Sequence, residues 1–284
     1  MLCYTQNSIV KDSLIINKSK LSLVSIAQLT AIGTSGVGLH SLWYSNNAPS
    51  KFHLFNDFGN WNNMDKIGHL YSSYQLSKVS YSLFKWSGMN QRQSTFAGSV
   101  TGLCFLSMIE IMDGFNSGWG FSISDMASNI LGAGLFSSQQ LIFEEQLFIP
   151  KFSYHPTRYA LIRPEVLGKT HVERFFKDYN GQTYWLSFSP KSIFKNSRLP
   201  EWFCFSIGYS TDMKILGNSD YYMSSNETFI AKKEFLFSLD IDFQKIPCKN
   251  KFLKFILNQL NYLKMPFPTL IWQNNKLSFT PLYF

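Results

Sequence analysis

The stretch MDKIGHLYSSYQLSKVSYSLFK, residues 64–85, predicts a long helix and sets the pattern that decides the fold. A helix over about 93–113 follows, without charge from Gln93 through Ile109. A further helix is expected after Ser122, a good N-cap residue, and it runs to about Glu145. These three segments, with one more upstream, predict a four-helix membrane-associated bundle over residues 21–149.

The upstream segment contains no Asp, Glu, Lys or Arg from Leu21 to Ser50. Its run LVSIAQLTAIGTSGVGLHSLWY could form one helix that ends near Tyr44. A helix that crosses a bilayer needs roughly 20 residues, so this one is long enough. A buried core helix is the alternative interpretation.

Residues 1–20 are predicted to form a polar leader. They lack a basic region followed by an apolar one, so no intact signal peptide is visible. Cys3 could carry a lipid, but its context Met-Leu-Cys-Tyr is too short to indicate this. The connector KFHLFNDFGNWNN at 51–63 is aromatic and rich in Asn, which is typical of an interfacial loop.

After Pro150 the sequence changes character, and short aromatic runs predict a smaller mixed region over 150–284. Residues 232–243 alternate, with phenylalanines on one face and acidic or hydroxyl side chains on the other, which predicts a half-buried strand. Strands are also expected at 202–210 and 277–284, and a short amphipathic helix at 252–264. The predicted fold class is therefore mainly α with a smaller α+β part, in which the bundle precedes antiparallel strands.

Composition favours contact with a membrane. Aromatic residues make up 17% of the chain and charged residues only 15%, against about a quarter charged in ordinary soluble domains. The mean hydropathy of -0.07 argues against a conventional transporter. The net charge of +8 falls entirely after residue 149. This basic region could face anionic lipid, whereas no nucleic-acid-binding motif accompanies it, so nucleic acid is not an expected partner.

Three polar pairs lie in otherwise apolar helices, at the start of the second helix, the end of the third and the start of the fourth. Each pair is spaced i, i+3 or i, i+4, so its members share a helix face. Because consecutive helices run antiparallel in such bundles, the three pairs are expected in one layer. The predicted binding layer consists of Asp65, Lys66, His69, Glu110, Asp113, Asp125 and Asn129.

Four carboxylates in one layer require a cation, a bound metal, shared protons, or Lys66 and His69 as partners. A divalent metal bound through His69, Glu110, Asp113 and Asp125 is chemically possible, and the same four residues are the candidate catalytic groups. The bundle lacks the Glu-x-x-His repeats of di-iron proteins. The alternative is a purely structural layer, since acidic residues suit helix N-termini.

The strings DKIGH at 65–69, EIMDG at 110–114 and SDMASN at 124–129, followed by Gly132, resemble the YfiM-type family of predicted periplasmic lipoproteins, which have a domain of unknown function. The same order is similar to VanZ-like membrane proteins. The resemblance covers about residues 60–135, and the longer architecture resembles envelope members from Bacteroidetes-type bacteria. It implies a helical core and placement in the cell envelope, and it implies no established reaction.

The leading functional prediction is an envelope accessory or binding protein at the outer membrane or the periplasmic face. It would hold a lipid or glycolipid head group, or a partner protein, at the polar layer. One alternative is an enzyme that modifies or hydrolyses an envelope lipid through His69 and clustered carboxylates, with or without a divalent metal, although no catalytic motif is complete. A second alternative is a subunit of an outer-membrane protein complex.

Overall fold

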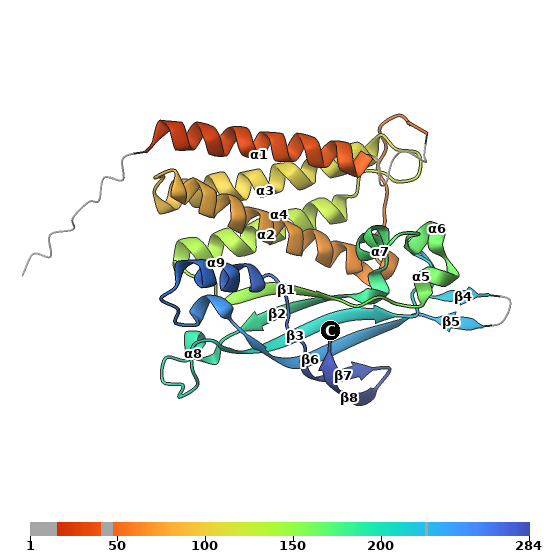
Figure 1. Cartoon of the computed structure of the whole chain (residues 1–284). Helices are drawn as coiled ribbons and strands as arrows, with labels where there is room; N and C mark the ends of the chain where they lie inside the picture. The colour runs from red at the N-terminus through yellow and green to blue at the C-terminus, as the bar shows by residue number, and fades with distance from the viewer. Residues whose placement is uncertain (1–15, 41–47, 225–226) are drawn as a thin grey trace, which may run out of the picture.

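A computed structural model describes residues 16–40, 48–224 and 227–284. Helices come first in the chain and a six-stranded antiparallel sheet follows, so the fold is mixed α+β (Figure 1). The four long helices are α1 (Lys18–Leu39), α2 (Met64–Trp86), α3 (Gln91–Gly114) and α4 (Ile123–Ile142).

The predicted helices are present, with two corrections at their ends. Helix α1 begins at Lys18, so the last residues of the predicted leader are helical. The side chain of Asn17 caps this helix by accepting a hydrogen bond from the Lys20 amide. Residues 1–15, including Cys3, and the predicted end near Tyr44 lie outside the described residues. Helix α4 ends at Ile142, three residues before the predicted end, and Glu144 then adopts a left-handed backbone with φ of 59°.

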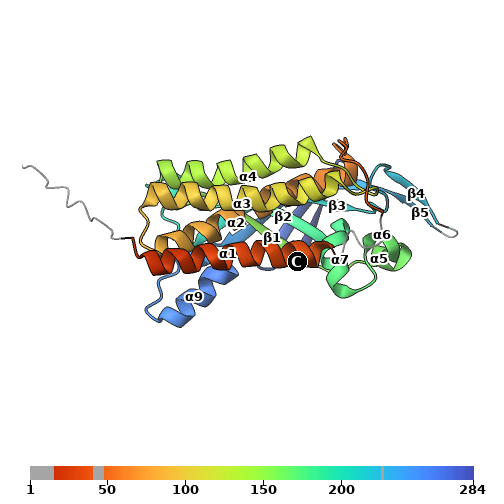
Figure 2. The ribbon, with the colours of Figure 1, turned by 90° about the horizontal axis from the view of Figure 1, so that it is seen from above.

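Helices α2, α3 and α4 pack closely together, and two glycines on α3 permit this. A Cβ on Gly98 would lie 2.6 Å from the backbone nitrogen of Tyr81, and one on Gly102 would lie 2.7 Å from Oγ of Ser77. The small-residue pair therefore faces α2. Helix α1 lies on the outer side of the bundle (Figures 1 and 2), and Val24 is its one described buried residue.

The connector before α2 is held on both sides. Its backbone pairs with the α3–α4 loop, where the Phe55 amide donates to the Phe121 carbonyl at 3.0 Å. On its other side, Asn62, in the short η2 helix (Asn60–Asn63), donates to Oγ1 of Thr211 at 2.8 Å. The connector therefore joins the bundle to the sheet.

The sheet has the strand order β1-β2-β3-β6-β7-β8. The three strands and the helix predicted in this region are present as β3, β6, β8 and α9. The sheet strands are β1 (Phe148–Tyr154), β2 (Gln182–Phe188), β3 (Phe203–Asp212), β6 (Lys232–Ile241), β7 (Phe267–Gln273) and β8 (Lys276–Tyr283). A two-stranded sheet is made of β4 (Tyr221–Met223) and β5 (Thr228–Ile230). The shorter helices are α5 (Tyr159–Ile162), α6 (Pro164–Leu167), α7 (His171–Lys177), α8 (Pro190–Ile193), α9 (Lys251–Leu260), η3 (Tyr179–Gly181) and η4 (Phe243–Lys245).

One face of the large sheet carries a row of apolar side chains that crosses five strands. Each member is paired in register with the next, and their exposed fractions run from 37% to 61%. This apolar row consists of Leu186, Ile207, Phe237, Leu270 and Phe279. Toward β1 the same face packs on α2, where the rings of Tyr71 and Tyr184 meet.

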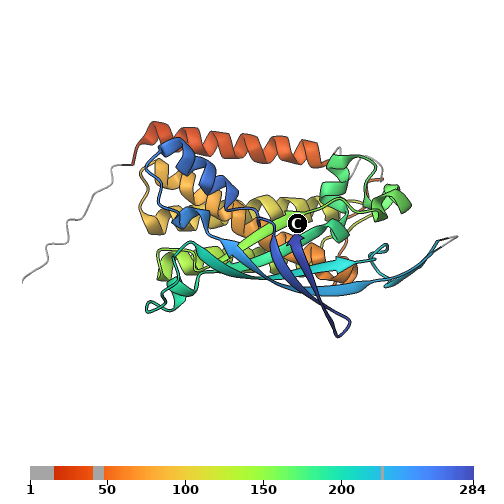
Figure 3. The same ribbon diagram turned by 60° about the horizontal axis from the view of Figure 1, so that its bottom comes forward.

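The opposite face of the sheet carries a row of hydroxyl side chains, each of which is adjacent in sequence to a member of the apolar row. Its members are Ser187, Ser206, Ser238, Thr269 and Thr280, and the first four are buried. The sheet curls around this face, so that the hydroxyls of Thr183 and Tyr283 lie 3.0 Å apart (Figure 3). The alternation predicted for residues 232–243 is present, and its polar face is the enclosed one.

Burial in this molecule runs against the usual distribution, in which apolar side chains fill the interior. Among the described residues, buried polar and charged side chains outnumber buried apolar ones. One buried apolar cluster lies beside the small sheet, around Tyr159, Leu167 and Phe229. Large exposed apolar residues instead lie on the outer faces of the sheet and the helices and in the connectors, such as Phe52, Leu54 and Phe58 before α2.

Candidate functional site

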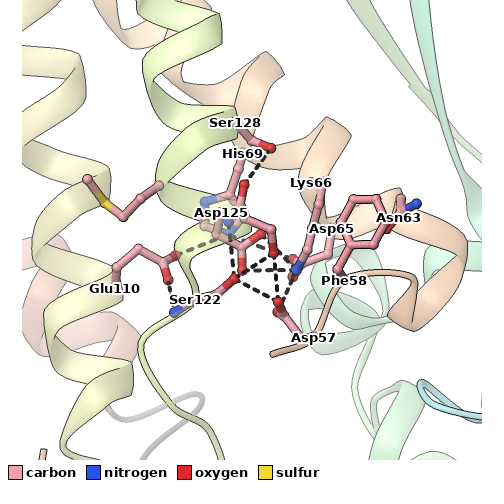
Figure 4. A network of polar contacts seen from close by, with 12 residues as sticks. Asp57, Phe58, Asn63, Asp65, Lys66, His69, Glu110, Ser122, Asp125 and Ser128 are labelled. Atoms are coloured by element: carbon pink, nitrogen blue, oxygen red, sulfur yellow. Dashed lines mark hydrogen bonds and ion pairs between the residues drawn. The ribbon is translucent and has the colours of Figure 1, made fainter. Parts of the chain in front are cut away.

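A buried polar cluster lies where the start of α2, the end of α3 and the start of α4 meet (Figure 4). Helix α4 begins there because Oγ of Ser122 accepts a 3.1 Å hydrogen bond from the Asp125 amide. Glu110 belongs to the last two turns of α3. The antiparallel order of the helices thus carries side chains from three helices to one end of the bundle.

Lys66 is the positive centre of one half of the cluster. Its Nζ lies 2.5 Å from Oδ2 of Asp57, 2.9 Å from Oδ1 of Asp125 and 3.3 Å from Oδ2 of Asp65. The Lys66 side chain is only 8% exposed. An ammonium group in such a place is stable only with close anionic partners, and three carboxylates supply them.

His69 occupies the other half. Its Nδ1 lies 3.0 Å from Oδ1 of Asn129, which fits an Nδ1–H that donates to the amide oxygen. Its Nε2 then faces two carboxylate oxygens, Oε1 of Glu110 at 3.5 Å and Oδ1 of Asp65 at 3.8 Å. The ring therefore presents one nitrogen to a fixed acceptor and the other to negative charge.

Glu110 is the most deeply buried acid of the cluster, at 1% exposure. Its Oε2 accepts a 3.3 Å hydrogen bond from the Ser122 amide, whereas its Oε1 has no hydrogen-bond partner among the described residues. Asp113, the remaining member of the predicted layer, follows Glu110 by three residues on α3. The backbone carbonyl of Asp113 accepts from the Asn116 amide, which helps to end α3.

The structure adds residues that sequence reasoning did not place in the layer. Asp57, from the connector, accepts hydrogen bonds from the hydroxyls of Ser122 at 2.7 Å and Ser124 at 3.0 Å. It is the one acidic residue of the segment 51–63, which was a usable signal. Tyr179, from η3, donates to Oδ1 of Asp65 at 2.8 Å. A lone tyrosine in the second half of the chain gave no such signal.

The charges within the cluster shift the pKa values of its members. Burial opposes ionisation of Asp57, but the hydrogen bonds from Lys66 and Ser122 outweigh it and lower the pKa of that carboxyl. Burial would also lower the pKa of Lys66, and the charges of Asp65 and Asp125 raise it instead. For His69, burial is again outweighed, by the charges of Asp65, Asp125 and Glu110, and the pKa is raised. Burial is not outweighed at Glu110 and Asp125, and it raises the pKa of these carboxyls to about 8 and about 6. The cluster therefore favours added positive charge, either as bound protons or as a cation.

Three of these side chains could together hold a metal ion. One ligand atom each from Asp65, His69 and Asp125 lies within 4.8 Å of the other two. None of these residues lines the described surface pocket of about 310 Å³, which lies near Asn62, Lys232 and Trp272. The cluster is therefore suited to a proton or a small ion.

Comparison with known protein families gives a match over the segment that contains most of the polar cluster. Residues 54–139 match the model of a family described as "Predicted periplasmic lipoprotein (DUF2279)". The match covers Asp57 and all the layer residues of α2, α3 and α4, and it leaves out Tyr179 and the sheet. No curated protein and no solved structure gives a significant match. The family description is consistent with an envelope-associated protein of unspecified activity.

Proposed function

We propose that this chain is a membrane-associated binding protein of the cell envelope, in which the outer face of the large sheet contacts lipid. The observation that carries the proposal is the apolar row, Leu186, Ile207, Phe237, Leu270 and Phe279, exposed across five adjacent strands. Strands that face a bilayer alternate along their length between apolar side chains on the lipid side and polar side chains on the inner side. The strands of this sheet show the same alternation.

The size of this surface supports the proposal. Contiguous exposed apolar patches beyond a few hundred Å² are rare on soluble monomers, because each Å² left in water forgoes about 25 cal/mol. Strands β3 and β6 have 10 residues each, so at about 3.3 Å per residue they are roughly as long as a bilayer core is thick. Lipid chains could cover the row on the inner strands β2, β3, β6 and β7, because the backbone groups of these strands pair with neighbouring strands on both sides.

Among the described residues, two helices are long and apolar enough to cross a membrane, α1 and α3. The window that qualifies in α1 is only 6% buried, and Leu23, Ile26 and Leu29 on this helix are all exposed. Core helices of soluble proteins and signal sequences can have the same length and hydropathy. The main argument for membrane contact is therefore the apolar row of the sheet, and α1 and α3 add support to it.

We place the lipid head group in the surface pocket near Lys232 and Trp272, whereas the sequence predicted it at the polar layer of the bundle. The pocket combines Lys232 and Lys233 with Trp272 and Phe235, and the last two continue the exposed apolar face. Basic and aromatic side chains together are typical of the polar boundary of a bilayer. A glycolipid or phospholipid head group in this pocket and a VanZ-like helical core are parts of the proposal. Membership of an outer-membrane protein complex is a separate alternative.

A flotation experiment tests the proposal. Purified full-length protein is mixed with liposomes of zwitterionic and anionic phospholipid and centrifuged through a density gradient. The wild type is expected to float with the lipid. The double variant Ile207→Glu and Phe237→Glu, checked for folding by circular dichroism, is expected to float at least tenfold less, since a charged residue facing lipid costs about 1–4 kcal/mol.

Leu161→Glu is the matched control, because Leu161 is exposed and apolar but lies in α5, away from the apolar row. Its flotation is expected to equal that of the wild type. A wild type that stays wholly in the soluble fraction, both in the gradient and after detergent-free cell fractionation, would overturn the proposal.

A further inference from the structure

We propose that Asp65, His69, Glu110 and Asp125 form a binding site for one first-row divalent cation, of which Zn²⁺ and Mn²⁺ are the best-fitting examples. This inference goes beyond the proposed contact with lipid and does not depend on it. It is carried by the distances between the donor atoms, the orientation of His69, the oxygen of Glu110 that lacks a hydrogen-bond partner, and the excess of carboxyl groups over cationic groups.

The donor atoms are already close to the spacing that a metal requires. Ligands at about 2.0–2.1 Å from a tetrahedral Zn²⁺ lie about 3.4 Å from one another. Nε2 of His69 and Oε1 of Glu110 are 3.5 Å apart, and Nε2 and Oδ1 of Asp65 are 3.8 Å apart. Asp125 belongs to a set with Asp65 and His69 in which one ligand atom from each residue lies within 4.8 Å of the other two. Glu110 joins this set through its 3.5 Å contact with Nε2 of His69.

The orientation of His69 is the arrangement expected of a metal ligand. Asn129 accepts from Nδ1 at 3.0 Å, which leaves the lone pair on Nε2 for coordination. Metal-binding histidines usually donate their other ring N–H to a fixed oxygen in this way. Without a proton or a cation at Nε2, its lone pair would face two carboxylate oxygens at less than 4 Å. That arrangement is repulsive, so a positive charge belongs between them.

Glu110 supplies the second, independent observation. The residue is 1% exposed, and its Oε1 points at the His69 ring without any hydrogen-bond partner among the described residues. A buried carboxylate oxygen left unpaired costs free energy on the scale of a lost hydrogen bond or more. A metal ion between Glu110 and His69 would satisfy this oxygen (Figure 4).

Lys66 cannot by itself balance the acidic groups of the cluster. It contacts Asp57, Asp65 and Asp125, but one ammonium group can balance only one carboxylate. The described cluster holds four carboxyl groups, and the remaining cationic group, the imidazole of His69, adds at most one positive charge. A divalent ion beside His69 and Glu110 would supply two positive charges and share Asp65 and Asp125 with Lys66.

The donor set selects the class of ion. One imidazole nitrogen with carboxylate oxygens suits Zn²⁺, Mn²⁺ or Fe²⁺. Ca²⁺ takes six to eight oxygen ligands and Mg²⁺ keeps several waters, and a buried site with a nitrogen donor suits neither. Lys66 restricts coordination to the side of the cluster toward His69 and Glu110 (Figure 4).

Metal titration of purified full-length protein tests the site. The protein is stripped with a chelator at pH 7.5, dialysed, and titrated with ZnCl₂ in a calorimeter with excess Mg²⁺ present. One saturable equivalent is expected. Titration with Co²⁺ is expected to give visible absorption bands of a four- or five-coordinate ion with nitrogen and oxygen ligands. His69→Gln should abolish these bands, and Glu110→Gln should weaken Zn²⁺ binding at least tenfold.

Glu144→Gln is the matched control, because Glu144 is an exposed acid beyond the opposite end of α4. Circular dichroism checks that each variant folds. The Zn²⁺ and Co²⁺ titrations of the wild type stand even if a variant does not fold. Absence of a saturable equivalent in the wild type would overturn the proposal and leave an imidazolium at His69 as the positive charge. Unchanged binding by folded His69→Gln or Glu110→Gln would overturn it as well.

Discussion

The hydroxyl of Tyr179 donates a 2.8 Å hydrogen bond to Oδ1 of Asp65, which lies 114 residues earlier in the chain. Asp65 lies in the first turn of α2, and Tyr179 begins η3, three residues before the start of β2. The ring of Tyr179 also packs on Trp61 of the connector, with centroids 5.4 Å apart. This contact ties the second half of the chain to the polar cluster at the end of the bundle.

Replacing Tyr179 by Phe is expected to destabilise the protein while leaving the fold intact. The change removes a hydrogen bond to a charged acceptor, which is typically worth about 1.5–3 kcal/mol. The free energy of unfolding, measured by denaturant titration in mild detergent, should fall by about that amount. Tyr221→Phe is the control, because Tyr221 is exposed and its hydroxyl contacts only the sulfur of Met223, at 3.7 Å, among the described residues. Equal effects of the two substitutions would contradict the role given to Tyr179.

The helical half of the fold was predictable because its signals are local. The predicted bounds of α2 and α3 lie within two residues of the observed ones, and the signal for α3 is the charge-free run from Gln93 through Ile109. Ser122 as an N-cap residue marked the start of α4. Antiparallel connection then implied that Asp65, Glu110 and Asp125 approach one another, and the structure places them around Lys66 and His69. The end of α4 at Ile142 was missed because no glycine or proline marks the turn there. The next two residues are Phe143 and Glu144.

The remainder of the cluster depends on contacts that no local pattern encodes. Asp57 reaches Lys66 only because the connector pairs with the α3–α4 loop, and Tyr179 reaches Asp65 only because the sheet packs on α2. In the same way, the alternation of β6 identified two faces but not which one is enclosed. The rule that apolar residues go inside fails for Phe235 and Phe237, because the sheet curls around its polar face.

The buried ion pair between Lys151 and Asp240 lies inside that curl, with both side chains at 0% exposure and 2.9 Å between Nζ and Oδ2. Asp240→Asn is expected to destabilise the protein by about 3–5 kcal/mol, because it leaves an ammonium group buried without a charged partner. Replacing both residues, as Lys151→Met with Asp240→Leu, should recover much of this loss, since no isolated charge remains.

Denaturant titration of the single and double variants measures both effects. Glu227→Gln is the surface control, because Glu227 pairs with Arg158 at 3.4 Å while both side chains are about half exposed or more. Exposed pairs contribute about 0–1 kcal/mol, so this control should remain close to the wild type. An Asp240→Asn variant as stable as Glu227→Gln would show that Lys151 is not held by the carboxylate.

Lys78 predicts a dependence of stability on pH. Burial on α2 lowers its pKa to about 8 from the ordinary value of 10.5. Since the folded protein binds this proton more weakly than the unfolded chain, the free energy of unfolding should rise with pH across the window from 8 to 10.5. Lys78→Met should therefore stabilise the protein by about 1–3 kcal/mol at pH 7, and the gain should shrink toward zero above about pH 10.

Unfolding measured at pH 7 and at pH 10 separates this effect from simple packing. Lys251→Met serves as the control, because Lys251 is an exposed first residue of α9, and its effect should be small at both values. A gain at Lys78 that is equally large at pH 7 and pH 10 would assign it to the methionine side chain and contradict the cost of the buried charge.

Because α2 and α3 pack closely, a glycine-to-alanine substitution is expected to change the stability of the protein in opposite directions at two helical glycines. In Gly102→Ala, the new Cβ would lie 2.7 Å from Oγ and 2.8 Å from the backbone nitrogen of Ser77. Because a backbone atom cannot rotate away, the helices must separate, and a loss of about 1–3 kcal/mol is expected. In Gly134→Ala, no described atom lies within 4 Å of the new Cβ, so the helix should gain about 0.5–1 kcal/mol from reduced backbone freedom. Thermal unfolding of both variants measures the difference, and a Gly102→Ala variant more stable than the wild type would show that α2 and α3 are not in backbone contact.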